Sequence, residues 1–367
     1  MNYLITAAGK GSRFLNCGIK PPKPLIKVAG NELLLWTLES FRFESNDSLY
    51  IITLKHHKVK ERLEKKINFL LQSIQVSWLE LDTETDGQLK TAIKAIKYFN
   101  ISGQLLIHNC DTYYKAEIDL FQKLLIKNNS FGLIPCFQGK GNHWSFAKTL
   151  PEDPTIAIEV AEKSRISSNC SVGSYLFASA EVLLSISNEY IATRKEDSGE
   201  YFIAPLYQYA LSKGMRVSVS EAKDVRLFGT PEELMQSFNI SFNEILGENA
   251  WHANQIGTLV VDIDGTLCGP SFKGDYTLVK PLSQVCNALR KANKLGLYII
   301  LFTSRNMRSF KGSLGLINKY TSPILLDWLL QNDIPFDEIY FGKPWGEDIS
   351  YIDDKAISIG DFIKKYP

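Results

Sequence analysis

Two aspartates separated by a single residue, Asp262 and Asp264, follow an apolar run and stand directly before Gly265. Alternate side chains of a β-strand share one face, so the two carboxylates point the same way if the strand geometry continues. Such a pair can hold Mg²⁺, or one carboxylate can attack phosphorus while the other handles the proton of the leaving group. The glycine then lets the backbone turn sharply. A buried strand that ends in a solvated turn would give the same local pattern, so the residues downstream decide between these interpretations.

Three further groups that suit phosphate chemistry follow this pair in order. A second apolar, β-type run at residues 298–302 ends in Thr303, then comes Lys343, and an acidic pair, Asp353 and Asp354, follows the lysine. This ordered set resembles the phosphatases of the haloacid dehalogenase (HAD) superfamily, and the resemblance covers roughly the last third of the chain.

The resemblance to the HAD phosphatases implies a role for each of these residues. Asp262 would be the nucleophile that forms an aspartyl-phosphate, and Asp264 would be the general acid/base. Thr303 and Lys343 would hold the phosphoryl oxygens, where the lysine charge matches the charge of the equatorial oxygens. One Mg²⁺ would be bound here by carboxylates from both acidic pairs: Asp262, Asp264, Asp353 and Asp354. For Asp354, a solvated or indirect position is an equal alternative to direct ligation.

The residues around these motifs narrow the resemblance. Thr-Ser-Arg-Asn-Met at residues 303–307 and Phe-Gly-Lys-Pro-Trp at 341–345 look like a small group of bacterial capsule-biosynthesis HAD phosphatases. By that likeness, Ser304 and Arg305 would contact the substrate. A helical stretch at residues 281–295 uses most of the interval between the first two motifs, which leaves little room for a large cap domain. An open, capless site could accept an extended substrate or one that another domain presents.

A different phosphate site is indicated at the N-terminal end. A short strand at residues 2–8 runs into Gly9-Lys10-Gly11-Ser12-Arg13. Small residues let the backbone approach a triphosphate, successive N–H groups can form an anion nest, and Arg13 adds a forked cation. The loop is not a Walker A motif, because no Gly-Lys-Ser/Thr closes it, and it lacks the third glycine of a dinucleotide fingerprint. A glycine-rich loop alone also serves as an ordinary tight turn.

Residues further along make this loop more specific. Lys23 follows between two prolines, and Asp111 ends a strand-like run at residues 105–111. With the loop, they resemble the sugar-phosphate nucleotidyltransferase family over about residues 1–240. The resemblance implies that Lys23 and Arg13 stabilise charge on the reacting phosphates and that Asp111 binds Mg²⁺, which gives one Mg²⁺ site in each domain. An ordinary strand-end turn is the alternative for Asp111. The implied nucleotide-binding residues are Ala8, Gly9, Gly11, Ser12, Arg13, Lys23 and Gly87.

More of this family's pattern follows, with one departure. The expected acceptor-binding residues match segments that line the family's sugar-phosphate pocket: Glu162, Lys163, Gly173 and Tyr175. For the first two, a surface ion pair is the alternative. Many members carry a second metal-binding aspartate two residues before the glycine of Gly-Thr-Pro, where this chain has Leu227. Asp224 lies out of register, so either the second ligand comes from elsewhere or one aspartate suffices with the phosphates of the NTP.

Composition bounds the class of protein. At 367 residues the chain exceeds one ordinary domain, and its 45% hydrophobic and 22% charged residues are globular values. A net charge of +1 gives no signature of nucleic-acid binding, and six scattered cysteines without a Cys-x-x-Cys pair indicate neither a disulfide framework nor zinc. No signal peptide or spanning segment is recognisable, so we expect a cytoplasmic protein without membrane insertion. Whether the chain forms a homo-oligomer stays open.

Some conspicuous side chains have a weaker claim to chemistry. His56, His57 and His143 have no partner at metal-ligand spacing, so we expect them to be structural or solvated. Trp144 is expected in the core or in a pocket wall. None of these four residues is needed for either resemblance.

Strand-like runs alternate with helical stretches in both halves, which is typical of α/β domains with mostly parallel sheets. With the two resemblances, the expected architecture is a Rossmann-like, mixed-sheet nucleotidyltransferase domain at residues 1–246 and a small, capless, HAD-like Rossmannoid domain at 257–367. The polar stretch 247–255 would separate them. Open α/β sheets bind ligands at the carboxyl ends of their strands, where Asp111, Asp262 and Thr303 would lie.

The sequence therefore predicts a bifunctional enzyme for bacterial capsule or surface-polysaccharide precursors. One domain would transfer a nucleotidyl group from an NTP, with CTP favoured by analogy, to a sugar or polyol phosphate and release pyrophosphate. The other would hydrolyse a phosphate monoester. Two alternatives remain open: the acceptor is phosphocholine or a phosphonate, or the N-terminal half, with Leu227 in place of an aspartate, binds nucleotide without catalysis.

Overall fold

The computed structural model describes residues 1–194, 199–249, 257–269, 276, 279–346, 349–351 and 353–367. Its contacts divide the chain into two compact units, Met1–Asn249 and Ala250–Pro367, each with its own sheet and core. The break falls within the polar stretch 247–255, most of which lies outside the described residues. The domain limits 1–246 and 257–367 stay a prediction.

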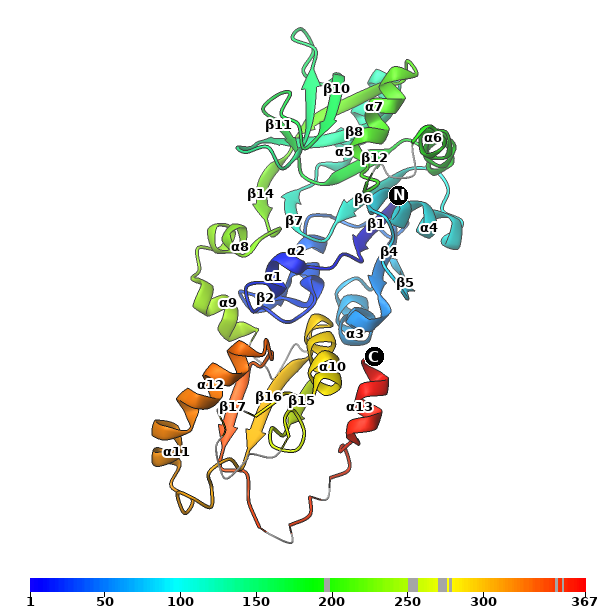
Figure 1. Ribbon diagram of the computed structural model, residues 1–367. Helices are drawn as coiled ribbons and strands as arrows, with labels where there is room; N and C mark the ends of the chain where they lie inside the picture. Colours follow the sequence, from blue (N-terminus) through cyan, green and yellow to red (C-terminus); the bar gives the residue numbers. More distant parts are fainter. Residues whose placement is uncertain (195–198, 250–256, 270–275, 277–278, 347–348, 352) are drawn as a thin grey trace. The chain divides into compact units, whose positions relative to one another are not determined.

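The first unit is an α/β fold on a ten-stranded mixed sheet, ordered β10-β9-β11-β8-β12-β6-β1-β4-β5, with β13 beside β8 (Figure 1). The strands of this sheet are β1 (Asn2–Ala7), β4 (Ser48–Leu54), β5 (Gln75–Leu81), β6 (Leu105–Asn109), β8 (Ser130–Gln138), β9 (Ser145–Thr149), β10 (Ala157–Glu162), β11 (Asn169–Ser171), β12 (Ser174–Phe177) and β13 (Arg216–Glu221). β1 runs parallel to its neighbours β4 and β6, whereas β12 is antiparallel to β6 and β8. Two small antiparallel pairs lie off this sheet: β2 (Lys27–Val28) with β3 (Asn31–Glu32), and β7 (Thr112–Lys115) with β14 (Lys223–Leu227).

Helices cover both faces of this sheet, as the alternation of β1 requires. Tyr3 and Ile5 pack with α2, α3 and α5 in one core cluster, whereas Leu4 between them packs with α4, α6 and α7 in another. The helices of the unit are α1 (Ser12–Leu15), α2 (Leu33–Leu38), α3 (Val59–Leu70), α4 (Gln88–Phe99), α5 (Ile118–Asn128), α6 (Ala180–Thr193), α7 (Ala204–Ser212), α8 (Pro231–Phe238) and α9 (Phe242–Glu248), with short 3₁₀ turns η1 (Lys23–Leu25) and η2 (Lys55–His57). In the described parts of the chain, no helix is both long and apolar enough to cross a membrane.

The last helices of the first unit return to its N-terminal loop. Phe14 of α1 shares a buried cluster with Phe228, Leu234 and Ile245. The end of α9 is fastened to the β2–β3 hairpin, because the Asn249 amide accepts from the Lys27 N–H at 2.8 Å and donates to the Lys27 carbonyl at 2.7 Å. This packing brings the Gly-Thr-Pro segment at residues 229–231 beside the loop that follows β1.

The second unit is a smaller α/β unit with three parallel strands in the order β15-β16-β17 (Figure 1). Its elements are β15 (Thr258–Val261), α10 (Ser283–Lys294), β16 (Tyr298–Thr303), α11 (Leu314–Tyr320), α12 (Ser322–Gln331), β17 (Glu338–Phe341) and α13 (Ile359–Lys365). Its core gathers Leu289 of α10, Ile299 and Leu301 of β16, and Leu325 and Trp328 of α12. Among the described residues, α10 is the one helix between the aspartate pair and Thr303.

Gly87 marks a close approach of two backbone segments in the first unit. It precedes α4 with φ +117° and ψ 169°, a conformation open essentially to glycine alone. A Cβ added there would lie 2.6 Å from both the backbone N and O of Tyr201. The Tyr201 N–H donates to the Asp86 carbonyl at 2.7 Å, and the Leu89 N–H donates to the Tyr201 carbonyl at 3.0 Å. Gly87 is therefore needed for the packing against the Tyr201 segment, in addition to any role in binding a ligand.

We expect Gly87→Ala to lower the free energy of unfolding by clearly more than Gly214→Ala. Gly214 also has positive φ, +75°, but nothing lies within 4 Å of an added Cβ, so its cost is the left-handed backbone alone, about 1–2 kcal/mol. At Gly87 a backbone clash adds to the strain. Urea titrations followed by circular dichroism measure both variants, and equal losses would contradict the close approach.

Candidate functional site

The glycine-rich loop after β1 lines a hollow of the first unit. Gly11 has φ +65° and stands directly before α1, and an added Cβ would lie 3.4 Å from the Lys23 Cβ. Glycine thus lets the loop turn and lie against Lys23. The hollow has a volume of about 460 Å³, and its wall includes four residues of the loop and two from other segments: Gly9, Gly11, Ser12, Arg13, Lys23 and Asp111. The structure therefore brings together predicted phosphate-binding residues from three separate segments.

Lys23 and Asp111 form an ion pair in this hollow. The ammonium Nζ lies 2.6 Å from Asp111 Oδ2, and the side chains are 13% and 29% exposed. Burial opposes ionisation of Asp111, but the adjacent Lys23 charge outweighs it and holds the pKa of this carboxyl below its usual value. The pair therefore places a cation and an ionised carboxylate together beside the phosphate-binding loop.

Leu227 stands where many members of the resembled family carry a second metal-binding aspartate, and the structure shows what surrounds this position. Leu227 pairs with Thr112 across β14 and β7, and the next N–H, of Phe228, donates to the Asp111 carbonyl at 2.8 Å. An aspartate at position 227 would thus stand next to Asp111, and leucine cannot ligate a metal. Asp224 lines a different hollow, together with Glu117 and Asp119, and not the one that contains Asp111.

The donor set around Asp111 suits a Mg²⁺ ion that is completed by its substrate. Mg²⁺ commonly takes one or two protein carboxylates plus phosphate oxygens and water. In the described parts of the chain, no three His, Cys, Asp or Glu side chains converge as a closed metal site. Asp111 is thus the predicted Mg²⁺ ligand that lines this hollow, and Glu162, Glu200 and Glu233 are further carboxylates of its wall.

The residues expected to bind the acceptor gather on another wall of the same hollow. The Ser145 hydroxyl donates a short hydrogen bond to the Glu162 carboxylate and lies 3.1 Å from the Tyr175 hydroxyl. Burial raises the pKa of Glu162, an effect that the Ser145 hydrogen bond partly offsets, and burial raises the pKa of Tyr175 to about 12. Lys163 has φ +53° and holds its Nζ 4.2 Å from the centre of the Phe202 ring. This wall thus offers hydrogen-bonding groups and one cation.

A second hollow of about 590 Å³ shares Gly9, Gln88 and Asp111 with the first. Ala8 and Gly87, expected to bind nucleotide, line this second hollow. Gln88 follows Gly87; its Nε2 donates to the Thr6 hydroxyl at 3.0 Å, which leaves its amide oxygen to other donors. Its role depends on the fold, because β1 and α4 meet only in the folded chain.

His143 and Trp144 also line the first hollow, although the sequence suggested no chemical role for His143. The His143 Nε2 lies 3.8 Å from a Glu233 carboxylate oxygen, and its ring centre is 4.2 Å from that of Trp144. Two hydrogen bonds from the Arg165 guanidinium, to the Gly141 and Gly139 carbonyls at 2.8 and 3.0 Å, hold the loop that carries them. Residue spacing gave no signal for this contact, because it depends on the return of the loop between β8 and β9.

In the second unit, the three parallel strands bring several predicted residues to one edge. Asp262 follows β15, Thr303 ends β16, and Lys343 follows β17. The Lys343 Nζ lies 3.0 Å from Asp262 Oδ1, and the Lys343 N–H donates to the Thr303 carbonyl at 3.1 Å. A carboxylate and an ammonium thus meet here as they do in the first unit.

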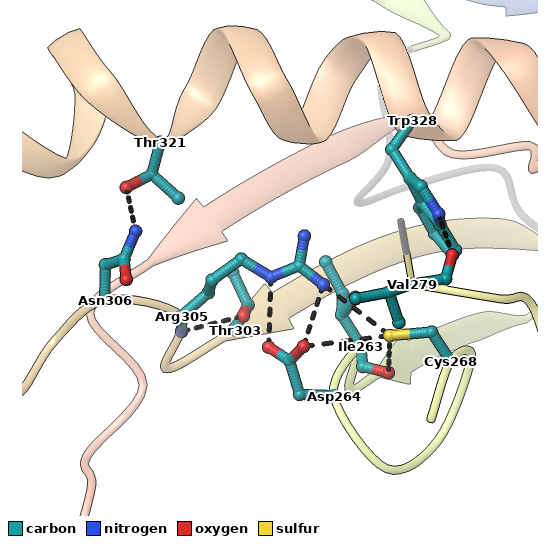
Figure 2. A network of polar contacts seen from close by, with 9 residues as sticks. All are labelled: Ile263, Asp264, Cys268, Val279, Thr303, Arg305, Asn306, Thr321 and Trp328. Carbon is teal, nitrogen blue, oxygen red and sulfur yellow. Dashed lines mark hydrogen bonds and ion pairs between the residues drawn. The ribbon is translucent and has the colours of Figure 1, made fainter. Parts of the chain in front are cut away.

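Asp264 and Arg305 take positions that differ from the sequence expectations. The guanidinium of Arg305 donates to both carboxylate oxygens of Asp264, and Arg305 is only 2% exposed (Figure 2). Arg305 is therefore turned away from solvent, whereas the sequence suggested a contact with substrate. Ser304 beside it is partly exposed. Both oxygens of Asp264 are engaged by Arg305, and its expected role as a metal ligand stays a prediction.

The second acidic pair does not join the first. Asp353 and Asp354 are exposed, and Asp353 accepts a hydrogen bond from the Lys355 N–H at 2.8 Å. In the parts of the chain that the structure describes, they form no metal-binding cluster with Asp262. The expected four-carboxylate Mg²⁺ site is therefore not assembled among the residues that the structure describes.

Comparisons with known proteins bear on the first unit. Residues 2–241 match the family model described as Nucleotidyl transferase. The Bifunctional protein GlmU of Methanocaldococcus jannaschii is 28% identical over 123 residues, which are 34% of this chain and span only 28% of that protein. A solved nucleoside-diphosphate-sugar pyrophosphorylase from Vibrio cholerae RC9 is 28% identical, with a TM-score of 0.57, over 65% of this chain and 100% of that one. A UDP-glucose pyrophosphorylase solved with UDP-glucose, 16% identical with a TM-score of 0.52 over 65% of this chain and 97% of its own, shares the fold.

The Lys23–Asp111 pair predicts a pH-dependent contribution to stability. The folded state lowers the pKa of Asp111, so the pair stabilises fully above the ordinary carboxyl pKa of about 4 and loses this effect as pH falls through the lower folded-state value. We expect Asp111→Asn to cost about 1 kcal/mol at pH 7 and progressively less toward pH 2. Urea titrations across pH measure this. Asp82→Asn, at an exposed position, is the control, and a cost for Asp111→Asn that grows in acid would contradict the pairing.

Proposed function

The chain belongs to the nucleotidyl transferase family, and on that premise we propose that its first unit transfers a nucleotidyl group from an NTP to a sugar or polyol phosphate and releases pyrophosphate. The observation that carries this proposal is the Lys23–Asp111 pair, 2.6 Å apart, beside the loop Gly9–Arg13. The small residues of the loop let a triphosphate approach the backbone, and Arg13 adds a cation for its oxygens. In the pair, Lys23 can stabilise negative charge on the reacting phosphate, and Asp111 can hold Mg²⁺ beside it.

The proposed reaction is an in-line displacement. A phosphate oxygen of the acceptor attacks the α-phosphorus, a new P–O bond forms, the bond to the β-phosphate breaks, and pyrophosphate leaves. Lys23 and Arg13 stabilise the charge that develops on the phosphoryl oxygens, and the walls of the hollow hold the two substrates in reacting geometry. Mg²⁺ held by Asp111 and the phosphates would neutralise further charge.

The acceptor class is proposed from the chemistry of the wall around Glu162. Glu162, Ser145 and Tyr175 present oxygen groups that hydrogen-bond hydroxyls, and Lys163 supplies a cation for a phosphate. The two pyrophosphorylases named above, one for nucleoside-diphosphate sugars and one solved with UDP-glucose, are in keeping with a sugar or polyol phosphate. CTP is the proposed nucleotide, by analogy with compact members of the resembled family, which often use it. Phosphocholine and phosphonates are the competing acceptors.

Pyrophosphate release tests the first function. We expect pyrophosphate and an NDP-linked product from one pair of NTP and acceptor phosphate, with CTP as the NTP, when an Asp262→Asn variant is supplied with Mg²⁺ and a panel of both substrates. Lys23→Met in this background should lower kcat by about 100-fold or more, because it removes charge stabilisation at the reacting phosphate. Lys127→Met, on the exposed face of α5, is the matched control.

Nucleotide binding without pyrophosphate from any pair would contradict the transfer reaction. That result would instead support the alternative in which the first unit binds nucleotide without catalysis, with Leu227 as the loss that explains it.

A second function is proposed for the second unit, because Asp262 and Lys343 meet 3.0 Å apart at the ends of parallel strands. We infer a HAD-like phosphatase in which Asp262 attacks the phosphorus of a monoester, the alcohol leaves, and water then hydrolyses the aspartyl-phosphate. Lys343 would stabilise the phosphoryl oxygens. Asp264, paired with Arg305, would act in proton transfer by taking a proton from the water that attacks the aspartyl-phosphate, and solvent would protonate the leaving alcohol. The unassembled acidic pair gives no basis for a step through a metal ion here.

The two proposed activities suggest a sequence of reactions. The phosphatase would trim a phosphorylated precursor, and the transferase would then activate the product for the assembly of a bacterial capsule or another surface polysaccharide. This order rests on the fusion of the two units. It requires that the product of hydrolysis be a substrate for nucleotidyl transfer.

Hydrolysis of p-nitrophenyl phosphate tests the second function. We expect the full chain to release p-nitrophenol in buffer that contains Mg²⁺, and Asp262→Asn to abolish this because it removes the nucleophile. Pyrophosphate release by the first unit should be unchanged in the same variant. Asp327→Asn, exposed on α12, is the control. Equal hydrolysis by the wild type and Asp262→Asn would contradict the assignment of the nucleophile.

A further inference from the structure

Arg305 is a buried charge that the reaction described above does not use. It follows β16 and is 2% exposed, and a charge so deeply buried is costly unless it is paired. Its Nε donates to Asp264 Oδ2 at 3.2 Å, and its Nη2 donates to Asp264 Oδ1 at 2.8 Å (Figure 2). This two-point contact fixes the plane of the carboxylate as well as its position.

Other contacts fix Arg305 itself. Its backbone N–H donates to the Thr303 hydroxyl at 3.0 Å, and the Tyr276 ring centre lies 4.3 Å from the guanidinium carbon. The Nη2 group also lies 3.6 Å from Cys268 Sγ, in the turn after Asp264. Arg305 therefore links the residue that ends β16 to the turn that follows β15 (Figure 2).

Stability alone is a weak reason for this arrangement. A buried ion pair often adds little net stability, because the desolvation of both charges offsets their attraction. Here the remaining Nη1 group of Arg305 is also buried, without a hydrogen-bond partner among the described residues, which adds to that cost. What the contact does provide is a fixed geometry for Asp264.

We propose that Arg305 is a positioning residue that holds the Asp264 carboxylate in line with the phosphoryl site of Asp262 and Thr303. This inference rests on the proposed phosphatase function, and it replaces the expected contact of Arg305 with substrate. Lysine cannot reproduce the role, because a single ammonium lacks the planar fork that grips both oxygens. The expected signature is a loss of turnover without a loss of substrate binding.

Steady-state hydrolysis of p-nitrophenyl phosphate by the full chain tests this role. We expect Arg305→Lys to lower kcat by about 100-fold, as for a displaced catalytic group, while KM stays within a few-fold of the wild type. Arg305→Lys combined with Asp264→Asn should be no slower than Asp264→Asn alone, because the two residues act as a unit. Arg308→Lys is the matched control: Arg308 lies in the same loop, with its guanidinium 5.1 Å from the Trp345 ring centre and outside this network.

Two kinetic results would overturn the inference. A higher KM with kcat retained in Arg305→Lys would mean that Arg305 contacts the substrate. Multiplicative losses in the double variant would mean that Arg305 does not act through Asp264. Thermal melting of each variant identifies a folding defect, and Arg305→Gln, alone and combined with Asp264→Asn, replaces the Arg305→Lys variants if these fail to fold.

A spectroscopic readout separates failure of the inference from failure of the proposed function. The Nε–H resonance of Arg305, assigned by its absence in Arg305→Lys, should shift in Asp264→Asn and stay in place in Asp327→Asn. If the wild type does not hydrolyse p-nitrophenyl phosphate, the phosphatase assignment fails. A shift of this resonance in Asp264→Asn would then mark the pair as a structural contact only, and the positioning role would be overturned with the function.

Discussion

Parallel strands end at one edge of a sheet, and in both units the carboxylate proposed to act lies where this constraint places it. In the first unit, β1 and β6 are in parallel register, with Thr6 beside Asn109, so the glycine-rich loop and Asp111 emerge together. In the second unit, β15, β16 and β17 deliver Asp262, Thr303 and Lys343 in the same way. Segments up to about a hundred residues apart in the chain meet for this reason alone.

Both units use this edge to pair a lysine with a strand-end carboxylate. The separations are 2.6 Å between Lys23 and Asp111 and 3.0 Å between Lys343 and Asp262. Each lysine is already partly neutralised, so a phosphate that binds there shares the ammonium with the carboxylate. Each carboxylate is in turn kept close to a cation. The same local chemistry can therefore serve two different reactions at phosphorus, depending on what the surrounding walls hold.

Local patterns in the sequence predicted the elements that carry this chemistry. The strand at residues 2–8, the helix at 281–295 and the run at 298–302 correspond to β1, α10 and β16, because the period of apolar residues depends on near neighbours. Contacts between distant segments were not predictable in this way. His143 reaches the hollow only through the return of a loop that Arg165 holds, and Arg305 turns from the expected substrate toward Asp264 because burial demands a partner. The acidic pair at Asp353 and Asp354 does not lie with Asp262 in a metal-binding cluster of the described residues. The order of motifs in the sequence could not predict this, because it does not fix the path of the connecting chain.

Following a ³²P label from the NTP into the products tests the central claim, nucleotidyl transfer by the first unit, most directly. The Asp262→Asn variant would be given Mg²⁺, the acceptor panel and NTPs labelled with ³²P at either the α- or the γ-phosphate. Nucleotidyl transfer predicts that the α-label moves into the acceptor-linked product and the γ-label into pyrophosphate. Transfer of the γ-label to the acceptor, or retention of both labels in the NTP despite nucleotide binding, would contradict the account.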